Sequence, residues 1–302
     1  MKKFIKFLTL IVILGTTYYY RQEINTFYLE HFQSQKKNVT LNDKNQYYKD
    51  ESYNYVQTTN DFLAKDKQHL LNIYYTIINS GIDHFTFYCS KEYENCLNDV
   101  VEIANNKTTL SNINSFVHPF NSFSNIETKY DTLGKITIKV NKSYTEEQIN
   151  AINDKVDDII NKELKNTSEK KEIVKLAHNY IINHSKYDSA KSDKNINNYL
   201  SSIAYGPLLQ GYGICGGYTD AMAIILDRFN IPNFKIISEN HIWNAVKIDG
   251  KWYHLDLTWD DPVTSDGSDV LEYNFFLITT KELENLEKTQ HVFDQNVFKE
   301  MI

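Results

Sequence analysis

The second half of the chain carries two hydrophobic periods, one typical of helices and one typical of strands. Residues 218–229 place apolar side chains on one helical face, whereas residues 234–237, 241–248 and 251–258 have the pattern of strands. Asp249 and Gly250 separate the last two strands, and Asp-Gly is typical of a two-residue hairpin turn. The pattern therefore predicts a helix followed by an antiparallel sheet with one tight hairpin.

Two helices are predicted before this region. Thr145 and Gln148 fit a capping box in front of an apolar helical face, and a second helix is expected to begin near Glu169. The remaining predicted elements are a polar loop, a buried strand and a short helix, at residues 188–198, 273–278 and 280–287. Together these elements predict one large α+β domain at residues 143–302.

Residues 60–142 have the pattern of a smaller α+β domain. A helix, a strand, a second helix and a second strand are predicted at residues 59–80, 84–89, 93–103 and 135–140. Leu133-Gly134 is predicted to form a turn before the last of these strands. The region is at the low end of usual domain size.

The first twenty residues have the pattern of an export signal. Lys2 and Lys3 form a basic head, and an apolar stretch follows from Phe7 to Gly15. No small-x-small cleavage site follows this stretch, so we expect residues 1–20 to be an uncleaved signal anchor in the cell membrane. A cleaved signal peptide and an ordinary amphipathic helix are the alternatives. We expect residues 21–59 to be a polar spacer, with the folded part outside the cytoplasm or secreted.

Composition and charge narrow the classes of partner. The 302 residues are 41% hydrophobic and 24% charged, which is typical of a globular protein with a sizeable core. The formal net charge of −7 argues against nucleic acid as a partner, because nucleic acids select basic surfaces. The sequence has no glycine-rich loop suited to phosphate, and we expect no cofactor.

Two of the three cysteines lie close together in the smaller domain. Cys89 and Cys96 would form a short disulfide in an oxidising compartment if the chain turned between them. In one continuous helix their Cα atoms would lie ~10 Å apart, which is too far for a disulfide. Two free buried thiols are the alternative. If the two cysteines pair, Cys215 is the free thiol.

Cys215 lies between glycines, directly before the helix predicted at 218–229. The run Gly-Ile-Cys-Gly-Gly at 213–217 lets the backbone turn sharply and lets a substrate approach closely. The thiolate is the reactive form of cysteine, and both a helix N-terminus and a neighbouring imidazolium favour it. The backbone N–H of Cys215 would also suit an oxyanion. Cys215 is therefore the candidate nucleophile.

The predicted hairpin brings a histidine and an aspartate together. With a two-residue turn, Ile248 pairs with Lys251, and Trp243 pairs with Asp256. His241 is then a diagonal neighbour of Asp256 on the same face, at a backbone separation of ~7–8 Å that side chains can close. Asp256 would orient the imidazole, and His241 would serve as base and then as acid toward the thiol.

Other roles for these side chains have less support in the sequence. Cys215, His241, His254 and Asp256 include ligand types for zinc, but no Cys-x-x-Cys or His-x-x-x-His pair accompanies them. We therefore expect no metal site. Gln210, five residues before the cysteine, is a second candidate for the oxyanion hole.

Three blocks of the sequence resemble the bacterial transglutaminase-like superfamily. They are Gly211-Tyr-Gly-Ile-Cys-Gly-Gly-Tyr218, His241-Ile-Trp-Asn244 and the run from Asp249 to Pro262. The resemblance implies a papain-like fold, in which a helix with the cysteine packs on an antiparallel sheet with the histidine and aspartate. It also implies Cys215 as nucleophile, His241 as base and Asp256 as the orienting acid. Gly216 and Ile242 depart from the Gln and Ala that are common at these positions in the family.

These observations predict an extracytoplasmic thiol enzyme that acts at amide bonds of proteins or peptides. The cell envelope is one source of such substrates. An amine acceptor would give cross-linking, as in an acyltransferase, and water would give hydrolysis, as in a cysteine peptidase or amidase. The alternative is a non-catalytic surface or cell-wall binding module on the same fold. A function centred on the smaller domain has less support, because its His84 and His118 are isolated.

Overall fold

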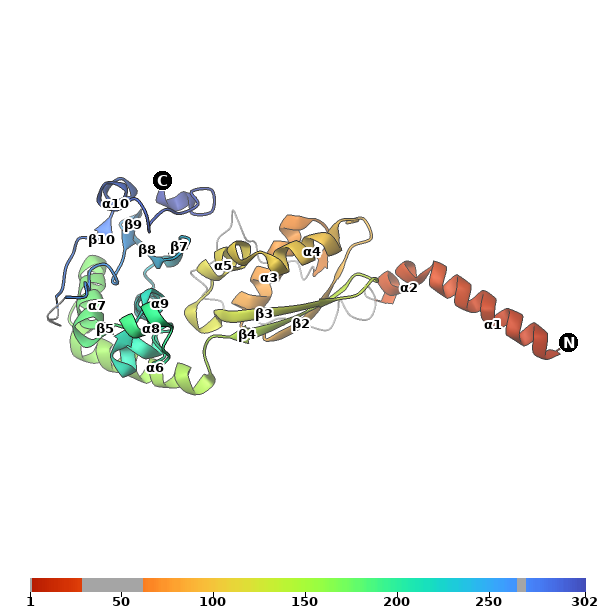
Figure 1. Cartoon of the computed structure of the whole chain (residues 1–302), viewed down its shortest axis with the longest axis horizontal. Helices are drawn as coiled ribbons and strands as arrows, with labels where there is room; N and C mark the ends of the chain where they lie inside the picture. Colours follow the sequence, from red (N-terminus) through yellow and green to blue (C-terminus); the bar gives the residue numbers. More distant parts are fainter. Residues whose placement is uncertain (1, 29–61, 265–269) are drawn as a thin grey trace. The chain divides into compact units, whose positions relative to one another are not determined.

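A computed structural model describes residues 2–28, 62–264 and 270–302 (Figure 1). The chain divides into two compact units. Within the described residues, the first unit comprises 2–28, 62–107 and 125–141, and the second comprises 108–124, 142–264 and 270–302. The domain expected at 60–142 thus includes residues 108–124, which cluster with the second unit.

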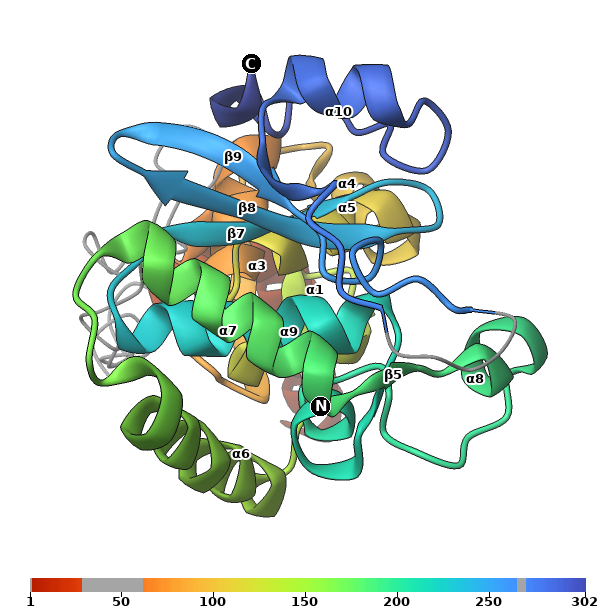
Figure 2. The same ribbon diagram turned by 90° about the vertical axis from the view of Figure 1, so that its left-hand side faces the viewer.

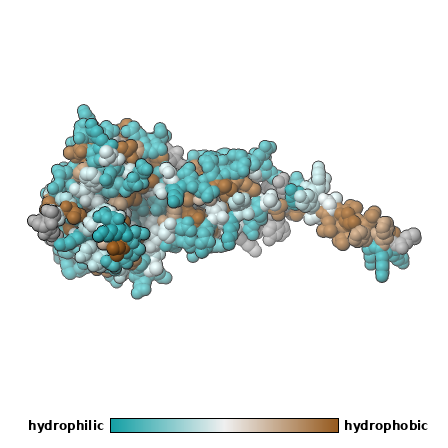
Figure 3. All heavy atoms as spheres, in the orientation of Figure 1, coloured by the Kyte–Doolittle hydropathy of each residue, from teal (hydrophilic) through white to brown (hydrophobic). Residues whose placement is uncertain are grey.

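Two helices stand at the start of the chain. α1 (Lys2–Tyr19) buries none of its side chains, and its apolar residues form the hydrophobic band visible in Figure 3. α2 (Arg21–Tyr28) lies in the stretch expected to be a spacer, and the rest of that stretch lies outside the described residues. Among the residues that the structure describes, none of the helices combines the length and hydropathy that a membrane span requires.

The first unit contains a four-stranded sheet in the order β1-β2-β4-β3. Its strands are β1 (Leu63–Ala64), β2 (His84–Cys89), β3 (Phe123–Tyr130) and β4 (Lys135–Lys142), and its helices include α3 (Lys67–Asn79) and α4 (Cys96–Asn105). The predicted strands at 84–89 and 135–140 are confirmed. β1 and β3 are not predicted by the sequence pattern, because β1 has two residues and β3 buries only Ile126.

A disulfide joins Cys89 to Cys96, with the two Cα atoms 5.9 Å apart. Cys89 ends β2 and Cys96 begins α4, so the residues between them form a turn rather than a continuous helix. This turn satisfies the condition that the sequence set for pairing. Cys215 is free.

The helices of the second unit are α5 (Lys107–Ser115), α6 (Glu146–Ile159), α7 (Lys170–His184), α8 (Ser189–Lys194), α9 (Cys215–Arg228) and α10 (Thr280–Leu286). The predicted starts of α6, α7 and α10 are confirmed. Thr145 and Gln148 form the predicted capping box of α6, and the Glu169 side chain caps α7. The loop predicted at 188–198 is wrong in part, because Asp188 caps the short helix α8 by accepting from the backbone N–H of Lys191.

The sheet of the second unit has the order β10-β9-β8-β7, and all its neighbouring strands are antiparallel. The strands are β7 (Asn233–Ile237), β8 (Ile242–Ile248), β9 (Lys251–Leu255) and β10 (Phe276–Ile278). In Figure 2, α7 and α9 lie on one side of this sheet and α10 lies on the other. A short parallel pair, β5 (Lys186–Tyr187) and β6 (Tyr212–Gly213), precedes α9. The expected α+β arrangement, with the cysteine-bearing helix packed on an antiparallel sheet, is confirmed.

The start of α9 packs unusually close to the loop at residues 201–203. A Cβ atom added to Gly217 would lie 2.2 Å from the carbonyl oxygen of Ser201 and 3.1 Å from that of Ile203. The Ser201 oxygen also accepts a hydrogen bond of 2.9 Å from the backbone N–H of Ile214. Glycine at position 217 is therefore needed for the close approach that fixes the position of Cys215.

Candidate active site

The hairpin between β8 and β9 has the predicted turn and register. Asp249 and Gly250 have φ angles of 49° and 82°, as a type I′ turn requires, and Ile248 pairs with Lys251. Regular pairing ends at Asn244 and Leu255, before the predicted pair of Trp243 with Asp256. The strand predicted to reach residue 258 ends early, because the backbone N–H of Asp256 donates to the carbonyl oxygen of Phe275 instead.

His241 and Asp256 nevertheless contact each other, as the register predicts. The His241 Nε2 lies 2.5 Å from the Asp256 Oδ2, and both side chains are buried. A tight turn fixes the histidine, because the backbone N–H of Ser238 donates to the His241 carbonyl and the Ser238 Oγ accepts from the His241 N–H. With Nε2 on the carboxylate, Nδ1 is the ring nitrogen that remains for the thiol.

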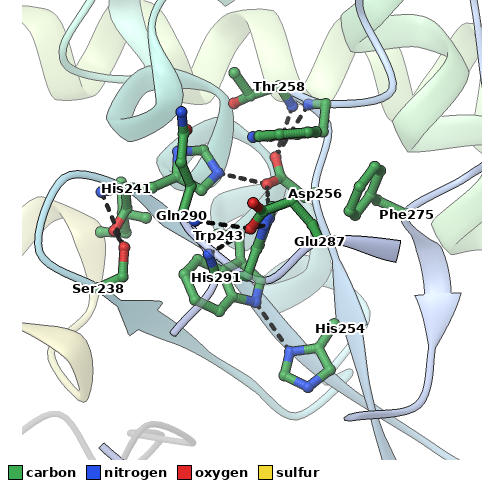
Figure 4. A network of polar contacts seen from close by, with 12 residues as sticks. Ser238, His241, Trp243, His254, Asp256, Thr258, Phe275, Glu287, Gln290 and His291 are labelled. Atoms are coloured by element: carbon green, nitrogen blue, oxygen red, sulfur yellow. Dashed lines mark hydrogen bonds and ion pairs between the residues drawn. The ribbon is translucent and has the colours of Figure 1, made fainter. Parts of the chain in front are cut away.

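The Asp256 carboxylate accepts four hydrogen bonds (Figure 4). Its Oδ1 accepts from the backbone N–H groups of Thr258 and Trp259, at 2.9 and 3.3 Å. Its Oδ2 accepts from His241 and from His291, the latter at 2.8 Å. Burial disfavours the charged carboxylate, but the charges and hydrogen bonds of the two histidines hold the pKa of Asp256 well below its usual range. The side chain is therefore an ionised and fully satisfied carboxylate.

The charge on Asp256 controls the protonation of His241. Burial favours the neutral imidazole, but the charge of Asp256, its hydrogen bond and the nearby Cys215 outweigh burial and raise the pKa of His241. The imidazolium form is therefore favoured at neutral pH. Such a group next to a cysteine stabilises the thiolate.

Cys215 is the first residue of α9 and is partly exposed. The residue before it, Ile214, is extended and makes no side-chain cap. The caps of α6 and α7, by contrast, carry oxygen atoms that accept from the helix N–H groups. The first N–H groups of α9 are thus not used by a capping side chain, which suits a negative charge at the thiol or on a bound oxyanion.

The loop after Asp256 is tied to both helices under the sheet. The Tyr218 hydroxyl, one turn along α9 from Cys215, donates to the Asp261 carboxylate. The neighbouring Asp260 lies 3.0 Å from the Nε2 of His178 on α7, and both of these side chains are fully buried. These two contacts hold the nucleophile-bearing helix and the orienting carboxylate in one framework.

His291 and Glu287 belong to the site but were not singled out by the sequence pattern. His291 lies in the segment after α10, 35 residues beyond Asp256, and its Nδ1 lies 3.1 Å from the Glu287 carboxylate. Burial disfavours the charge on Glu287, but hydrogen bonds from Thr289 and His291 lower the pKa of Glu287 to about 2. The Glu-x-x-x-His spacing is the only local signal that would have suggested this contact.

The aromatic residues of the hairpin region differ in position. Trp243 is fully buried, and its ring lies against His241, with centroids 5.7 Å apart. Trp259 is partly exposed beside His241 and contacts Phe275. Trp252 packs on Phe234, away from the triad contacts. Trp243 therefore packs against the histidine as a buried ring, and Trp259 is the partly exposed tryptophan beside it.

The remaining candidates are engaged elsewhere. The Gln210 Oε1 accepts from the backbone N–H of Leu200 at 2.7 Å. His254 accepts a hydrogen bond from the Trp243 indole and contacts Thr280. Burial first, and then the charge of His291, lower the pKa of His254 to about 3, so it is neutral.

One group of side chains has the composition of a metal site. Among the described residues, His241, Asp256 and His291 place three ligand atoms within 4.8 Å of one another. Two imidazoles and a carboxylate would suit zinc. These atoms, however, already form hydrogen bonds to each other at 2.5 and 2.8 Å, which leaves the group satisfied without an ion. His254 does not belong to this group.

A family model matches part of the chain. Residues 157–257 match the sequence model of the Transglutaminase-like superfamily. Solved structures that resemble the chain include a TGase, at 18% identity over 45% of each chain with a TM-score of 0.34. Another is a protein described as a candidate cysteine protease from Cytophaga hutchinsonii, at 13% identity over 48% of this chain and 65% of that one, with a TM-score of 0.28. The chain thus spans less than two thirds of either structure. No curated protein matches the sequence significantly.

Proposed function

We propose that this protein is a thiol-dependent enzyme acting on amide bonds of proteins or peptides, because residues 157–257 match the model of the Transglutaminase-like superfamily. The observation that carries the proposal is the buried 2.5 Å contact of His241 with Asp256, beside a free and partly exposed Cys215. These are the three groups that an activated cysteine nucleophile needs.

The reaction would proceed in two steps. The Cys215 thiolate attacks the amide carbon, a C–S bond forms, the C–N bond breaks, and His241 gives the Nδ1 proton to the departing nitrogen. The products are a thioester and an amine or ammonia. In the second step a primary amine or water attacks the thioester and loses a proton to His241, and Cys215 leaves as a thiolate. Asp256 holds the imidazole in place and stabilises its charged form throughout.

The choice of acceptor separates acyl transfer from hydrolysis. A primary amine would cross-link two proteins or peptides, and water would make the protein a peptidase or amidase. The partly exposed Trp259 would favour an organic acceptor over water by placing apolar surface beside the His241 imidazole. Acyl transfer is therefore the preferred form of the proposal.

We place the reaction outside the cytoplasm, with the protein held at the membrane by its N-terminal segment or secreted. The basic residues followed by the apolar stretch of α1 support export. The Cys89–Cys96 disulfide supports an oxidising compartment. Proteins of the cell envelope are then the accessible substrates, and the net charge of −7 gives no support for a nucleic-acid partner.

The thiol itself offers the first test. With Cys89 and Cys96 paired, Cys215 is the one cysteine of three that iodoacetamide can modify, so non-reducing labelling of the full-length protein reports this residue alone. We expect labelling at neutral pH well above the rate of glutathione, and a loss of that excess in His241→Ala. A wild-type rate equal to that of glutathione would instead favour a non-catalytic binding module.

A second assay distinguishes the reactions. The protein is incubated with a glutamine-containing peptide, with and without a labelled primary amine, and with Cys215→Ala as the control. Amine incorporation that needs Cys215 indicates acyl transfer, and ammonia or peptide fragments formed without amine indicate hydrolysis.

A further inference from the structure

We propose that His291 and Glu287 are positioning residues for the thiol chemistry, fixing Asp256 as Asp256 fixes His241. The inference rests on the proposed function, and it extends the site from three side chains to five. The added residues come from the C-terminal segment after α10, which lies outside the superfamily match at 157–257.

His291 is held at both of its ring nitrogens. Its side chain is almost fully buried, its Nε2 lies 2.8 Å from Asp256 Oδ2, and its Nδ1 lies 3.1 Å from Glu287 Oε2. The Glu287 carboxylate also accepts from the backbone N–H groups of Thr289, Gln290 and His291, at 2.7, 2.7 and 2.9 Å. Glu287 thus folds the turn that carries His291 and orients its ring at the same time.

Asp256 and Glu287 are both hydrogen-bond acceptors for His291. Asp256 and Glu287 both have lowered pKa values and are ionised, so each can only accept. His291 contacts one of these acceptors with each ring nitrogen. It therefore links Glu287 to Asp256, and through Asp256 to His241, in one line of hydrogen-bonded side chains.

His291 and His241 share one acceptor, the Asp256 carboxylate. Both imidazoles point toward the Asp256 carboxylate in Figure 4, and their Nε2 atoms meet at the same oxygen, Oδ2. The ring of His291 is held between aromatic neighbours, stacked on Phe275 and edge-on to Trp243. The oxygen that orients His241 is thus fixed from two sides, and it cannot turn away without breaking a buried charged hydrogen bond.

This arrangement gives an electrostatic signature. The groups that face His291 are Asp256 after β9, Glu287 after α10, His241 before β8 and the neutral His254 on β9. Loss of His291 leaves His241 as the one imidazole partner of Asp256 Oδ2, which the two rings otherwise share. His241 would then bind its proton more tightly, although the carboxylate that orients it is less well fixed.

The experiment compares Cys215 labelling by iodoacetamide across pH in the full-length protein and in His291→Gln and Glu287→Gln. For His291→Gln we expect the maximal labelling rate of Cys215 to be about 10-fold lower, because the geometry of the site is less well fixed. We also expect the alkaline limb of the pH profile, where His241 loses its proton, to lie at higher pH. Glu287→Gln keeps an acceptor oxygen for His291, and a smaller change in the same direction is expected.

Two variants serve as matched controls. Glu284→Gln makes the same change of charge on α10, in the wall of the same 410 Å³ pocket as Glu287, and should leave the profile unchanged. His254→Gln removes a buried but neutral histidine and should not shift the alkaline limb. Near-ultraviolet circular dichroism identifies any variant that fails to fold.

A readout that does not depend on reactivity separates this inference from the proposed function. The imidazole N–H protons of His241 and His291 on Asp256 should give downfield proton resonances, and His291→Gln should remove one and shift the other. If wild-type Cys215 is labelled rapidly and folded His291→Gln has the same pH profile of labelling, the positioning role of His291 is overturned and the proposed function still stands. If wild-type Cys215 is labelled no faster than glutathione, the proposed function is refuted. If the His241 N–H resonance is also unchanged in His291→Gln, the positioning role of His291 is overturned as well.

Discussion

Replacement of Asp256 by asparagine tests the electrostatics of the site most directly. The carboxylate is buried and accepts four hydrogen bonds, two of them from imidazoles, and its charge raises the pKa of His241. Asparagine offers one acceptor oxygen, and its NH₂ group would have to face either a backbone N–H or an imidazole N–H. Removing one partner of a buried ion pair costs about 3–5 kcal/mol of unfolding free energy.

The loss of unfolding free energy in Asp256→Asn should depend on pH, and the pKa shifts of Asp256 and His241 determine the direction of that dependence. The pKa of Asp256 is lowered in the folded protein, so its contribution is present above the unfolded value near ~4 and is lost as the pH falls through the folded value. The pKa of His241 is raised, so its contribution is complete below the unfolded value near ~6.5 and is lost as the pH rises through the folded value. The difference between wild type and Asp256→Asn should therefore be largest between about pH 4 and pH 6.5.

Denaturant unfolding of both proteins at about pH 6 and about pH 9 measures this difference. We expect a loss of about 3 kcal/mol at the lower pH and a smaller loss at the higher one. Iodoacetamide labelling of Cys215 should meanwhile fall to the rate of glutathione, because the neutral His241 no longer stabilises the thiolate. Equal losses of stability at both pH values would refute the assignment of a charged pair.

Three further outcomes are expected. Gly217→Ala should lower the unfolding free energy by more than about 2 kcal/mol, because its Cβ would lie 2.2 Å from the Ser201 carbonyl oxygen. Gly250→Ala meets open space and carries only the strain of its φ of +82°, about 1 kcal/mol, so a larger cost at position 250 would contradict the packing argument. Cys89→Ser should cost about 2–3 kcal/mol by opening an eight-residue loop, measured by denaturant unfolding, and should leave the labelling rate of Cys215 unchanged once the second thiol is also replaced. Dialysis against EDTA should leave the labelling rate of Cys215 unchanged, because the candidate metal ligands His241 and His291 both bond to the third, Asp256. A labelling rate that rises after EDTA would indicate a bound ion.

The hairpin was predictable because its signals are local. Asp249-Gly250 determines the turn type, and the period of two in the flanking segments determines the register, so the contact of His241 with Asp256 followed from the sequence. The early end of β9 was not predictable, because it depends on the carbonyl of Phe275, which belongs to another part of the chain.

The second histidine shows a different limit of sequence reasoning. His291 lies in a segment without a hydrophobic period, and its partner Asp256 lies 35 residues earlier. Its position depends on a turn held by one carboxylate and on the packing of three aromatic rings, which no short-range pattern encodes. The same holds for the contacts of Tyr218 with Asp261 and of His178 with Asp260, which join helices to a loop far along the chain.

These two contacts also determine how the thiol should respond to denaturation. A buried cysteine usually becomes more reactive as a protein unfolds, because the reagent gains access. Here the loop that holds Asp256 is bonded through Asp260 and Asp261 to α7 and α9, so detaching either helix also separates the thiol from its base. Cys215 should therefore react more slowly in denaturant than in the native protein, and its alkylation rate would report the fraction of native molecules in a stopped-flow experiment.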